Sequence, residues 1–512
     1  MMKTVKRSFC IFLSILFLLT MLIPTAFAAE SKGYTISNPY ANVDFSTVKS
    51  YKAALHTHTN ATDGDPTLKQ SIERHVETGF DIVATTDHGT VNYTWETENA
   101  NKLIHGALSL VGRSEGELEY LGKEGTFANG TSYKLTSENG DDYLVLNDGS
   151  KILRVPYGIE QNAISANAHV NSWFVDYHKD SITSYKDAIS NVSRMGGICV
   201  INHPGEYSKA RYEIHSSDAY NTDKLAYWYL VNKWASLLNE YDGCIGIDIN
   251  SKGDDRTKYD RVLWDELLQR FSANGKNVFA ICSSDAHQLD KINTGFIYAL
   301  MPSLDSASLK SALKNGEFFG ASHCIGNYEE LVEIYNSLNE FYGESETCIA
   351  VKETVDKMAT RIDDIETGKV DADSNIGITY KVLDDDGYFN GEAEPIITNI
   401  KVDDYTDTIT ISAENALIVR WISNGKLVTT TKGDESSFNL AEFSDKIGNY
   451  VRAEVFGEGG IVYTQAFILN AEQNANSSSV VDKGFFDFGI LDCLVGIFEN
   501  WGDILSRMIK NI

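Results

Sequence analysis

The sequence predicts an α/β protein in which a barrel of strands and helices precedes an all-β region. Short apolar runs alternate with helical patterns over residues 50–325, which is typical of βα units. Runs of alternating apolar and polar residues then recur between turns over residues 374–470, which is typical of a β-sandwich. A chain of 512 residues is too long for one core. We therefore expect a βα barrel followed by a separate β-sandwich domain.

The first 28 residues have the organisation of a secretory signal peptide. Three bases occur before residue 8, an apolar run covers residues 10–23, and Ala26-Phe27-Ala28 is a small-x-small cleavage site. An uncleaved membrane anchor is the alternative interpretation. We expect a secreted or cell-surface protein.

Charge and cysteine usage exclude two classes of function. The formal net charge is −28, and such an acidic surface repels nucleic-acid backbones. The seven cysteines show no CxxC spacing, which argues against a thiolate zinc site. Cys199, Cys244 and Cys282 lie inside apolar runs, so we interpret them as buried thiols.

Five strand-like runs end in a residue that can bind a metal ion. These runs precede His56, Asp87, Glu160, His203 and Asp285. In a βα barrel the carboxyl ends of the strands meet at one face. We therefore expect these side chains to converge at the C-terminal face of the barrel.

Other segments interrupt or follow this rhythm. Residues 92–156 contain the hairpin dipeptides Asn129-Gly130, Asn139-Gly140 and Asp148-Gly149, which predict a β insertion that caps the pocket. Residues 327–370 are predicted to form a helical connector, and 471–484 an Asn/Ser-rich linker. Residues 485–512 predict an amphipathic helix, for which contact with a membrane or cell wall, docking on the chain itself and self-association are the alternatives.

The spacing of the candidate ligands favours metal binding. His56 and His58 are two residues apart, so a strand places both on one side, where they can chelate an ion. Asp285 and His287 repeat this spacing with a carboxylate, which permits bridging between two ions. Glu160 could also bridge. Structural histidines at a strand end are the alternative, which the number of such motifs disfavours.

Two further motifs add to this set. Asp87-His88 follows the second run and Asn202-His203 ends the fourth. We interpret His88 and His203 as ligands and Asp87 as a residue that orients a ligand histidine.

In this order the motifs resemble the PHP (polymerase and histidinol phosphatase) metallohydrolases. They are His-x-His, Thr-Asp-His, Gly-Ile-Glu with a later His-Val, Asn-His-Pro and Ser-Asp-Ala-His. The resemblance covers residues 50–325 and implies a distorted (β/α)7 barrel with a trinuclear metal centre. Glu160 would bridge two ions. The implied ligands are His56, His58, Asp63, His88, Glu160, His169, His203, Asp285 and His287. Residues 264–268 and 308–319 resemble secreted or stand-alone members, some of them similar to carbaryl-type hydrolases.

The implied cofactors are two or three divalent ions, with Zn²⁺, Mn²⁺ and Fe²⁺ all suited to these N and O ligands. The implied chemistry is hydrolysis by a metal-activated bridging water. Neither a Gly-x-Ser-x-Gly elbow nor a P-loop occurs in the sequence, so no protein nucleophile is assigned.

Polar residues after two of the runs are candidates for binding substrate. A lysine or arginine at the barrel rim can hold a phosphate group, and ordinary surface bases are the alternative. The candidates are Tyr207, Lys209, Arg211, Lys252 and Arg256.

The function expected from the sequence is a secreted, metal-dependent phosphoesterase acting on a small or medium phosphate ester. A hydrolase of carboxyl or carbamate esters with the same metal centre is the first alternative. The second is a non-catalytic binding or adhesion module.

Overall fold

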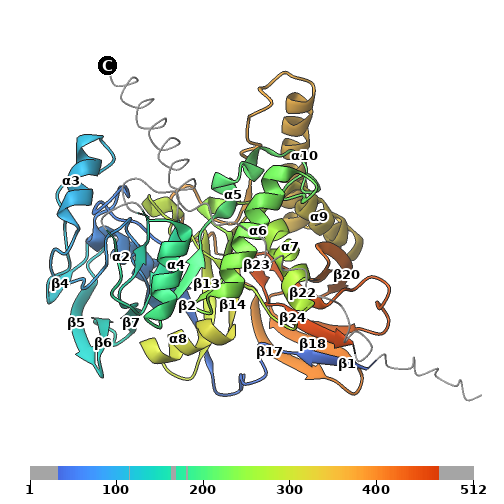
Figure 1. The fold of residues 1–512 in the computed structure, drawn as a ribbon, viewed down its shortest axis with the longest axis horizontal. Helices are drawn as coiled ribbons and strands as arrows, with labels where there is room; N and C mark the ends of the chain where they lie inside the picture. Colours follow the sequence, from blue (N-terminus) through green and yellow to red (C-terminus); the bar gives the residue numbers. More distant parts are fainter. Residues whose placement is uncertain (1–32, 115, 163–168, 180–182, 392, 472–512) are drawn as a thin grey trace, which may run out of the picture.

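The protein is a mixed α/β molecule with several sheets (Figure 1). The computed structural model describes residues 33–114, 116–162, 169–179, 183–391 and 393–471. The signal peptide predicted for residues 1–28 and the amphipathic helix predicted for 485–512 lie outside this part, as does nearly all of the 471–484 linker. Among the described helices, none combines the length and apolarity needed to span a membrane.

Two sheets carry the five strand-end motifs. One is a five-stranded sheet with the order β12-β11-β10-β9-β8. The other contains the order β14-β13-β2-β3-β7 within a 14-stranded sheet. The strands of the first sheet are β8 (Ile159–Glu160), β9 (Val170–Trp173), β10 (Ile198–Ile201), β11 (Cys244–Asn250) and β12 (Phe279–Cys282). Those of the second are β2 (Lys49–Ala54), β3 (Ile82–Val83), β7 (Lys151–Arg154), β13 (Gly295–Met301) and β14 (Phe318–Ser322).

The predicted closed barrel is not found among the described residues. In the part of the chain that the structure describes, isolated bridges link the ends of the two sheets: Thr57 with Ala286, His88 with Glu160 and Asn92 with Gly158. The βα rhythm is also broken, because β9 runs antiparallel to both β8 and β10. Only β10, β11 and β12 on one side, and β2, β3 and β7 on the other, form parallel pairs.

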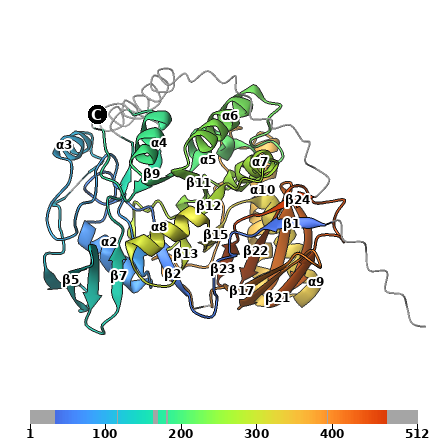
Figure 2. The ribbon, with the colours of Figure 1, turned by 60° about the horizontal axis from the view of Figure 1, so that its bottom comes forward.

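Helices cover these sheets where their apolar faces are buried. On the five-stranded sheet, α4 (Tyr185–Arg194), α6 (Leu225–Glu240) and α7 (Asp260–Ser272) contact β9, β10 and β11. Next to β13 lies α8 (Ser306–Asn315), and α2 (Leu68–Glu77) follows the first motif loop (Figure 2). Between β10 and α6 are α5 (Pro204–Tyr207) and a short turn, η1 (Ala210–Tyr212). The predicted buried thiols Cys199, Cys244 and Cys282 are free and buried.

The insertion forms a helix and a β meander at one end of the molecule (Figure 2). Its elements are α3 (Lys102–Leu110), β4 (Glu124–Thr126), β5 (Ser132–Glu138) and β6 (Asp141–Leu146), and β6 pairs with β7. The meander therefore extends the sheet of β2 and β3 outward. His105 on α3 and Ser114 bond the carbonyls of Ala61 and Asn60, which ties the insertion to the loop after His58.

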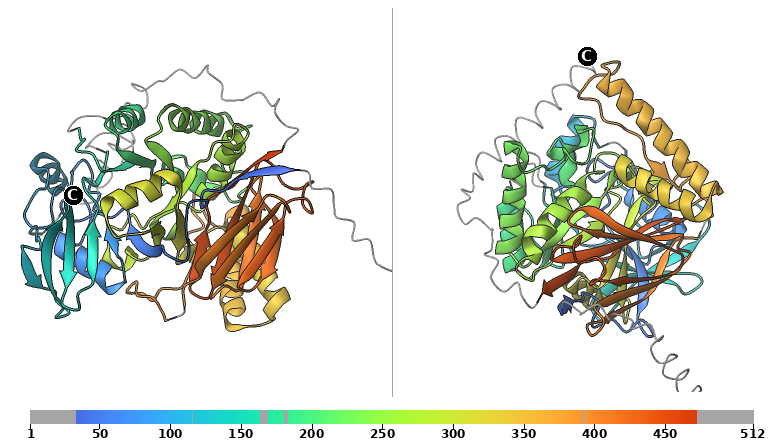
Figure 3. Two further views of the ribbon diagram at one scale, coloured as in Figure 1. Left: turned by 90° about the horizontal axis from the view of Figure 1, so that it is seen from below. Right: turned by 90° about the vertical axis from the view of Figure 1, so that its right-hand side faces the viewer.

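The C-terminal strands lie at the opposite end of the molecule (Figure 3). A three-stranded sheet contains β17 (Ile396–Asp403), β18 (Thr408–Glu414) and β21 (Glu435–Asn439). The others are β19 (Ile418–Ser423), β20 (Lys426–Lys432), β22 (Tyr450–Gly457), β23 (Gly460–Tyr463) and β24 (Phe467–Ala471). Two long helices, α9 (Tyr328–Tyr342) and α10 (Glu346–Glu366), precede them, and the short strands β15 (Cys324–Ile325) and β16 (Tyr380–Lys381) pair with each other.

A separate β-sandwich domain is not confirmed. β23 pairs with β14, so five of the C-terminal strands, β19, β20, β22, β23 and β24, continue the 14-stranded sheet that holds β2. The N-terminal strand β1 (Tyr34–Ser37) pairs with β24 at the far edge (Figure 3). Alternation in the sequence identifies a strand but not its partner, since pairing is decided by distant residues.

Candidate metal centre

The candidate ligands meet at one edge of the two sheets. His56 and His58 follow β2, His88 follows β3, and His203 follows β10. Glu160 ends β8, and Asp285 and His287 follow β12. His169 immediately precedes β9, and because β9 is antiparallel to its neighbours, its first residue lies at the edge where theirs end.

The backbone at two of these residues is held in an uncommon conformation. The φ angle is +24° at His203 and +46° at Asp285, within the left-handed region that costs an L-residue roughly 1–3 kcal/mol. Such strain accumulates at binding sites because the surrounding fold holds the side chain in a required direction. A close approach shapes the Asp63 loop as well: a Cβ on Gly64 would lie 2.7 Å from the carbonyl carbon of His58.

Four donor atoms surround one point. His56 Nε2 and His58 Nε2 are 3.1 Å apart, and Asp285 Oδ1 lies 3.2 and 3.1 Å from them. Glu160 Oε2 lies 3.6 Å from His56 Nε2 and 3.4 Å from His58 Nε2. Metal bonds of about 2.0–2.1 Å at tetrahedral angles separate neighbouring donors by about 3.3–3.4 Å. We call these four atoms the four-donor set; the five distances just given, 3.1–3.6 Å, are close to those between donors of a tetrahedral metal site.

A second group lies on the Asp63 side. Asp63 Oδ1 is 3.4 Å from His88 Nε2, 3.5 Å from His287 Nε2 and 3.9 Å from His58 Nδ1. His58 thus directs one ring nitrogen to each group, and its ring stacks on that of His287 with centroids 4.3 Å apart. The two groups are arranged to share this histidine.

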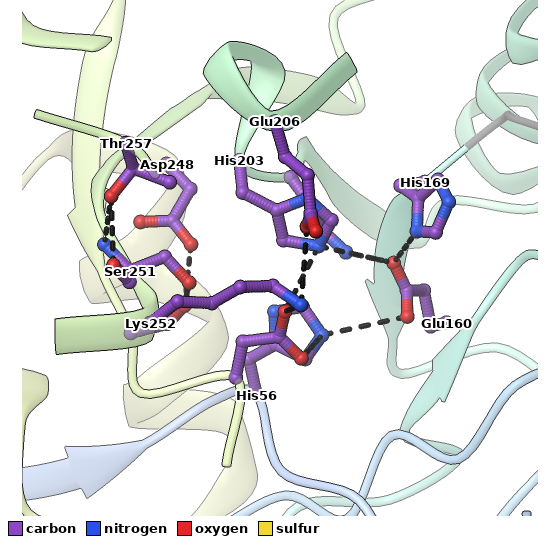
Figure 4. Close-up of polar contacts among 12 residues, drawn as sticks. His56, Glu160, His169, His203, Glu206, Asp248, Ser251, Lys252 and Thr257 are labelled. Atoms are coloured by element: carbon purple, nitrogen blue, oxygen red, sulfur yellow. Dashed lines mark hydrogen bonds and ion pairs between the residues drawn. The ribbon is translucent and has the colours of Figure 1, made fainter. Parts of the chain in front are cut away.

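A third group lies around the other oxygen of Glu160. Glu160 Oε1 is 2.7 Å from His169 Nδ1 and 3.6 Å from His203 Nε2, and it accepts a hydrogen bond from Asn202 Nδ2 at 2.9 Å (Figure 4). Glu160 therefore directs one oxygen to the four-donor set and one to this group, the geometry of a bridging carboxylate. All nine predicted ligands belong to these three groups.

The residues present fit divalent ions. Within the described part of the chain, three buried carboxylate oxygens of this cluster have neither a hydrogen bond nor a lysine or arginine partner: Asp63 Oδ1, Glu160 Oε2 and Asp285 Oδ1. The other oxygen of Asp285, Oδ2, faces the Lys252 ammonium. Leaving such an oxygen unsatisfied is costly, and a cation compensates it. Neutral imidazole and carboxylate together suit Zn²⁺, Mn²⁺ or Fe²⁺.

The carboxylates stay ionised although they are buried. Burial alone would raise the pKa of Glu160 and Asp63, but nearby histidines, His88 first among them, bring both pKa values well below their ordinary range. Burial also opposes ionisation of Asp285, whose pKa is likewise lowered, chiefly by Lys252 and then by histidines. The three carboxylates therefore remain ionised and can serve as ligands to a cation.

Asp87 orders a loop. Its carboxylate accepts hydrogen bonds from the Thr59 backbone at 2.7 Å and from the Thr59 and Thr62 hydroxyls, both at 2.9 Å. It thereby holds the segment between His58 and Asp63. The expected bond from Asp87 to a ligand histidine stays a prediction.

The candidate substrate residues separate into three kinds. Tyr207 stacks on the His169 ring with centroids 4.2 Å apart. Lys252 Nζ is 3.1 Å from Glu206 Oε2 (Figure 4). Arg256 Nη1 is 2.7 Å from Glu206 Oε1. Arg211 Nη1 is 4.0 Å from Glu206 Oε1, and Lys209 lies outside the metal cluster with a φ of +64°.

Glu206 lies beside the candidate ligands but is not among the residues that the sequence motifs predict. It gathers the bases just described, and its Oε2 is 3.6 Å from His203 Nδ1. Lys252 and His203 outweigh the effect of burial and lower the pKa of Glu206 below its ordinary value. Its position three residues after His203, on the first turn of α5, was the available signal.

Comparisons with known proteins add a distant likeness. No protein-family model matches the chain, and no curated protein matches it. Among solved structures, a two-domain protein from Bacteroides vulgatus ATCC 8482, described as containing a predicted PHP-like metal-dependent phosphoesterase, is similar at 12% identity. The alignment covers 84% of this chain and 89% of that one, with a TM-score of 0.32. At this TM-score the likeness does not support a function for this chain.

Proposed function

We propose that this protein is a metal-dependent hydrolase of the PHP type that cleaves phosphate esters. The four-donor set carries the proposal, since Asp285 Oδ1 and Glu160 Oε2 both lie 3.1–3.6 Å from the Nε2 atoms of His56 and His58, close to the donor spacing of a tetrahedral site. Glu160 and His58 extend that set into two further groups, which supports a centre of two or three ions.

Divalent ions held there supply Lewis acidity toward a phosphoryl oxygen and make water acidic enough to attack near neutral pH. The chain's own contribution is to hold nine donors in place. Asn202 fixes Oε1 of Glu160, and Asp87 fixes the loop that carries Asp63. Asp285 is fixed by its strained backbone.

The base group beside the centre supports a phosphate ester over a neutral ester. Lys252, Arg256 and Arg211 all approach Glu206, and Lys252 also contacts Asp285, so three basic side chains face two carboxylates on this side. An anionic substrate group gains from such an excess. A carboxyl or carbamate ester has no anionic group at its reacting centre to use it.

The test is hydrolysis of three chromogenic esters by the full chain, with and without added Mn²⁺ or Zn²⁺. We expect p-nitrophenyl phosphate or bis-p-nitrophenyl phosphate to be cleaved, with p-nitrophenyl acetate the poorest substrate. Preference for the acetate would favour the carboxyl-ester alternative. Metal analysis that finds fewer than one ion per chain would favour a non-catalytic binding module.

A further inference from the structure

An ammonium group lies inside the candidate metal centre. Lys252 Nζ is 2.8 Å from Asp285 Oδ2 and 3.1 Å from Glu206 Oε2 (Figure 4). The Lys252 side chain is 22% exposed, whereas that of Asp285 is 1% exposed. The lysine therefore reaches a buried ligand carboxylate from the edge of the site.

The loop after β11 delivers this lysine in a defined position. The φ angles of Lys252, Gly253 and Asp254 are +50°, +64° and +60°, a run of left-handed residues. Arg261 holds the loop by donating to Asp254 Oδ1 at 3.1 Å and Oδ2 at 2.8 Å. The Lys252 backbone N–H donates to the Ser284 carbonyl, beside Asp285, at 3.1 Å. These contacts do not use the Lys252 side chain, so they remain when it is replaced.

The two oxygens of Asp285 face different groups. Oδ1 belongs to the four-donor set, whereas Oδ2 is 3.2 Å from His203 Nε2. His203 Nε2 is in turn 3.6 Å from Glu160 Oε1. We call Asp285 Oδ2 and His203 Nε2, with Glu160 Oε1 on the other side of His203 Nε2, the His203 subsite. The ammonium binds the same Asp285 oxygen that an ion in this subsite would use.

Two physical effects follow from this position. An ammonium and a divalent ion compete for the lone pairs of one carboxylate oxygen. They also repel each other, and at separations of a few ångströms in a poorly solvated site this repulsion is large. The four-donor set is less affected, because it uses Oδ1 and three donors that Lys252 does not contact.

We propose that Lys252 is a built-in competitor that weakens ion binding at the His203 subsite, so that the four-donor set fills first and the His203 subsite fills last. Glu206 positions this competitor by sharing its ammonium. The inference rests on the proposed metal centre. The inference adds to the proposed centre the order in which its sites fill and the residue, Lys252, that sets this order.

The test is isothermal titration calorimetry, in which the metal-free full chain is titrated with Mn²⁺ and, in a separate experiment, with Zn²⁺. The wild type is expected to bind ions in at least two affinity classes. Lys252→Met removes the charge at similar length, and we expect the weakest class to bind about tenfold tighter or more. Lys252→Arg, the matched control, keeps the charge and should retain separate classes. Glu206→Gln should weaken the last ion several-fold, because Lys252 is then left to Asp285 alone.

The opposite directions of these two variants make the proposal falsifiable. Unchanged or weaker binding of the last ion in Lys252→Met, with an unchanged melting temperature, would overturn it. Tighter binding of the last ion by Glu206→Gln would also overturn it. This variant keeps Lys252, so it tests the proposal even if Lys252→Met fails to fold. A wild type with a single class of equal sites would contradict it too. Failure of the metal centre itself gives a different result, namely no ion binding, or equal binding by wild type and His58→Ala.

Discussion

Two regions of this molecule bury many charges, and they treat them differently. Near the C-terminal strands, Arg261, Arg420 and Arg452 form a buried ionic network with four carboxylates. Arg261 Nη2 is 2.8 Å from Asp254 and 2.7 Å from Glu330, and Arg452 is 2.8 Å from Asp265 and 2.6 Å from Glu454. Arg420 also pairs with Glu454. In this network each carboxylate has an arginine beside it.

The metal cluster buries carboxylates without such partners. Glu160, Asp285 and Asp63 face imidazoles, and Lys252 is the one permanent cation paired with them, at Asp285 Oδ2, among the described residues. Asp63 Oδ1, Glu160 Oε2 and Asp285 Oδ1 lack a hydrogen bond there. Arginine provides permanent charge and directed donors, whereas imidazole can offer a lone pair instead. A buried acid facing arginine is therefore already satisfied. A buried acid facing several histidines is arranged for an ion that comes from outside.

The largest effect that this contrast predicts is on activity. His58→Ala removes a residue that two of the metal groups share. Loss of residues that merely orient a ligand typically costs 10–100-fold, so we expect kcat on p-nitrophenyl phosphate to fall about 100-fold or more. Metal analysis should show fewer bound ions. His75→Ala is the control, since this buried histidine bonds the Ser71 carbonyl in α2 and lies outside the cluster. A His58→Ala protein with full activity would refute the catalytic role of the cluster.

Breaking the arginine network should act on stability instead. Arg452→Met leaves Asp265 and Glu454 buried without this cation, and removing one partner of a buried pair costs about 3–5 kcal/mol. Urea denaturation should show this loss in the free energy of unfolding. Metal content and activity per folded molecule should stay at the wild-type level. If Arg452→Met kept normal stability but lost its metal, the arginine network would serve metal binding and not stability, contrary to this comparison.

Removal of bound metal should lower the stability of the protein by less than Arg452→Met does. An ion at 100 times its Kd stabilises the folded state by about 2.7 kcal/mol for one site. We therefore expect added Mn²⁺ or Zn²⁺ to raise the melting temperature of chelator-treated protein, measured by calorimetry. In Arg452→Met the melting temperature should be lower without metal but should rise by the same amount when metal is added. In His58→Ala the rise should be smaller. Equal increases in all three proteins would indicate binding elsewhere.

The smallest expected effect is on the pH dependence of stability. Burial raises the pKa of Glu330 to about 7, although Arg261 and Arg420 act in the opposite direction. A carboxyl whose pKa is higher in the folded state binds more protons folded than unfolded, so stability falls as pH rises from the ordinary carboxyl range to about 7.

Glu330→Gln should flatten this decline by on the order of 1 kcal/mol across that window. Urea denaturation at several pH values measures it. Glu333→Gln is a suitable comparison, because Glu333 contacts Arg420 too but its side chain is 40% exposed. If the unfolding free energy of Glu330→Gln depended on pH as that of the wild type does, a group other than Glu330 would bind this proton in the folded state.

Local spacing was enough to identify much of the site. All five strand-like runs are strands whose ends meet, and the i, i+2 pair His56-His58 directs both side chains to one group. Asp285 and His287 reach the same cluster but belong to different groups. A strand places alternate residues on one side whatever the rest of the fold does. His169 needed more than spacing, because it reaches the cluster through the reversed direction of β9.

Which residues can bind a metal, and which lie at strand ends, was determined by the sequence alone, because both depend only on side-chain chemistry and short-range geometry. The tertiary structure decided the rest. It left the barrel open and paired β23 with β14. It also brought Lys252 to Asp285, a contact between the loops after β11 and β12. Strand pairing and the direction of a rim lysine depend on residues far apart in the chain, whose meeting no local pattern encodes.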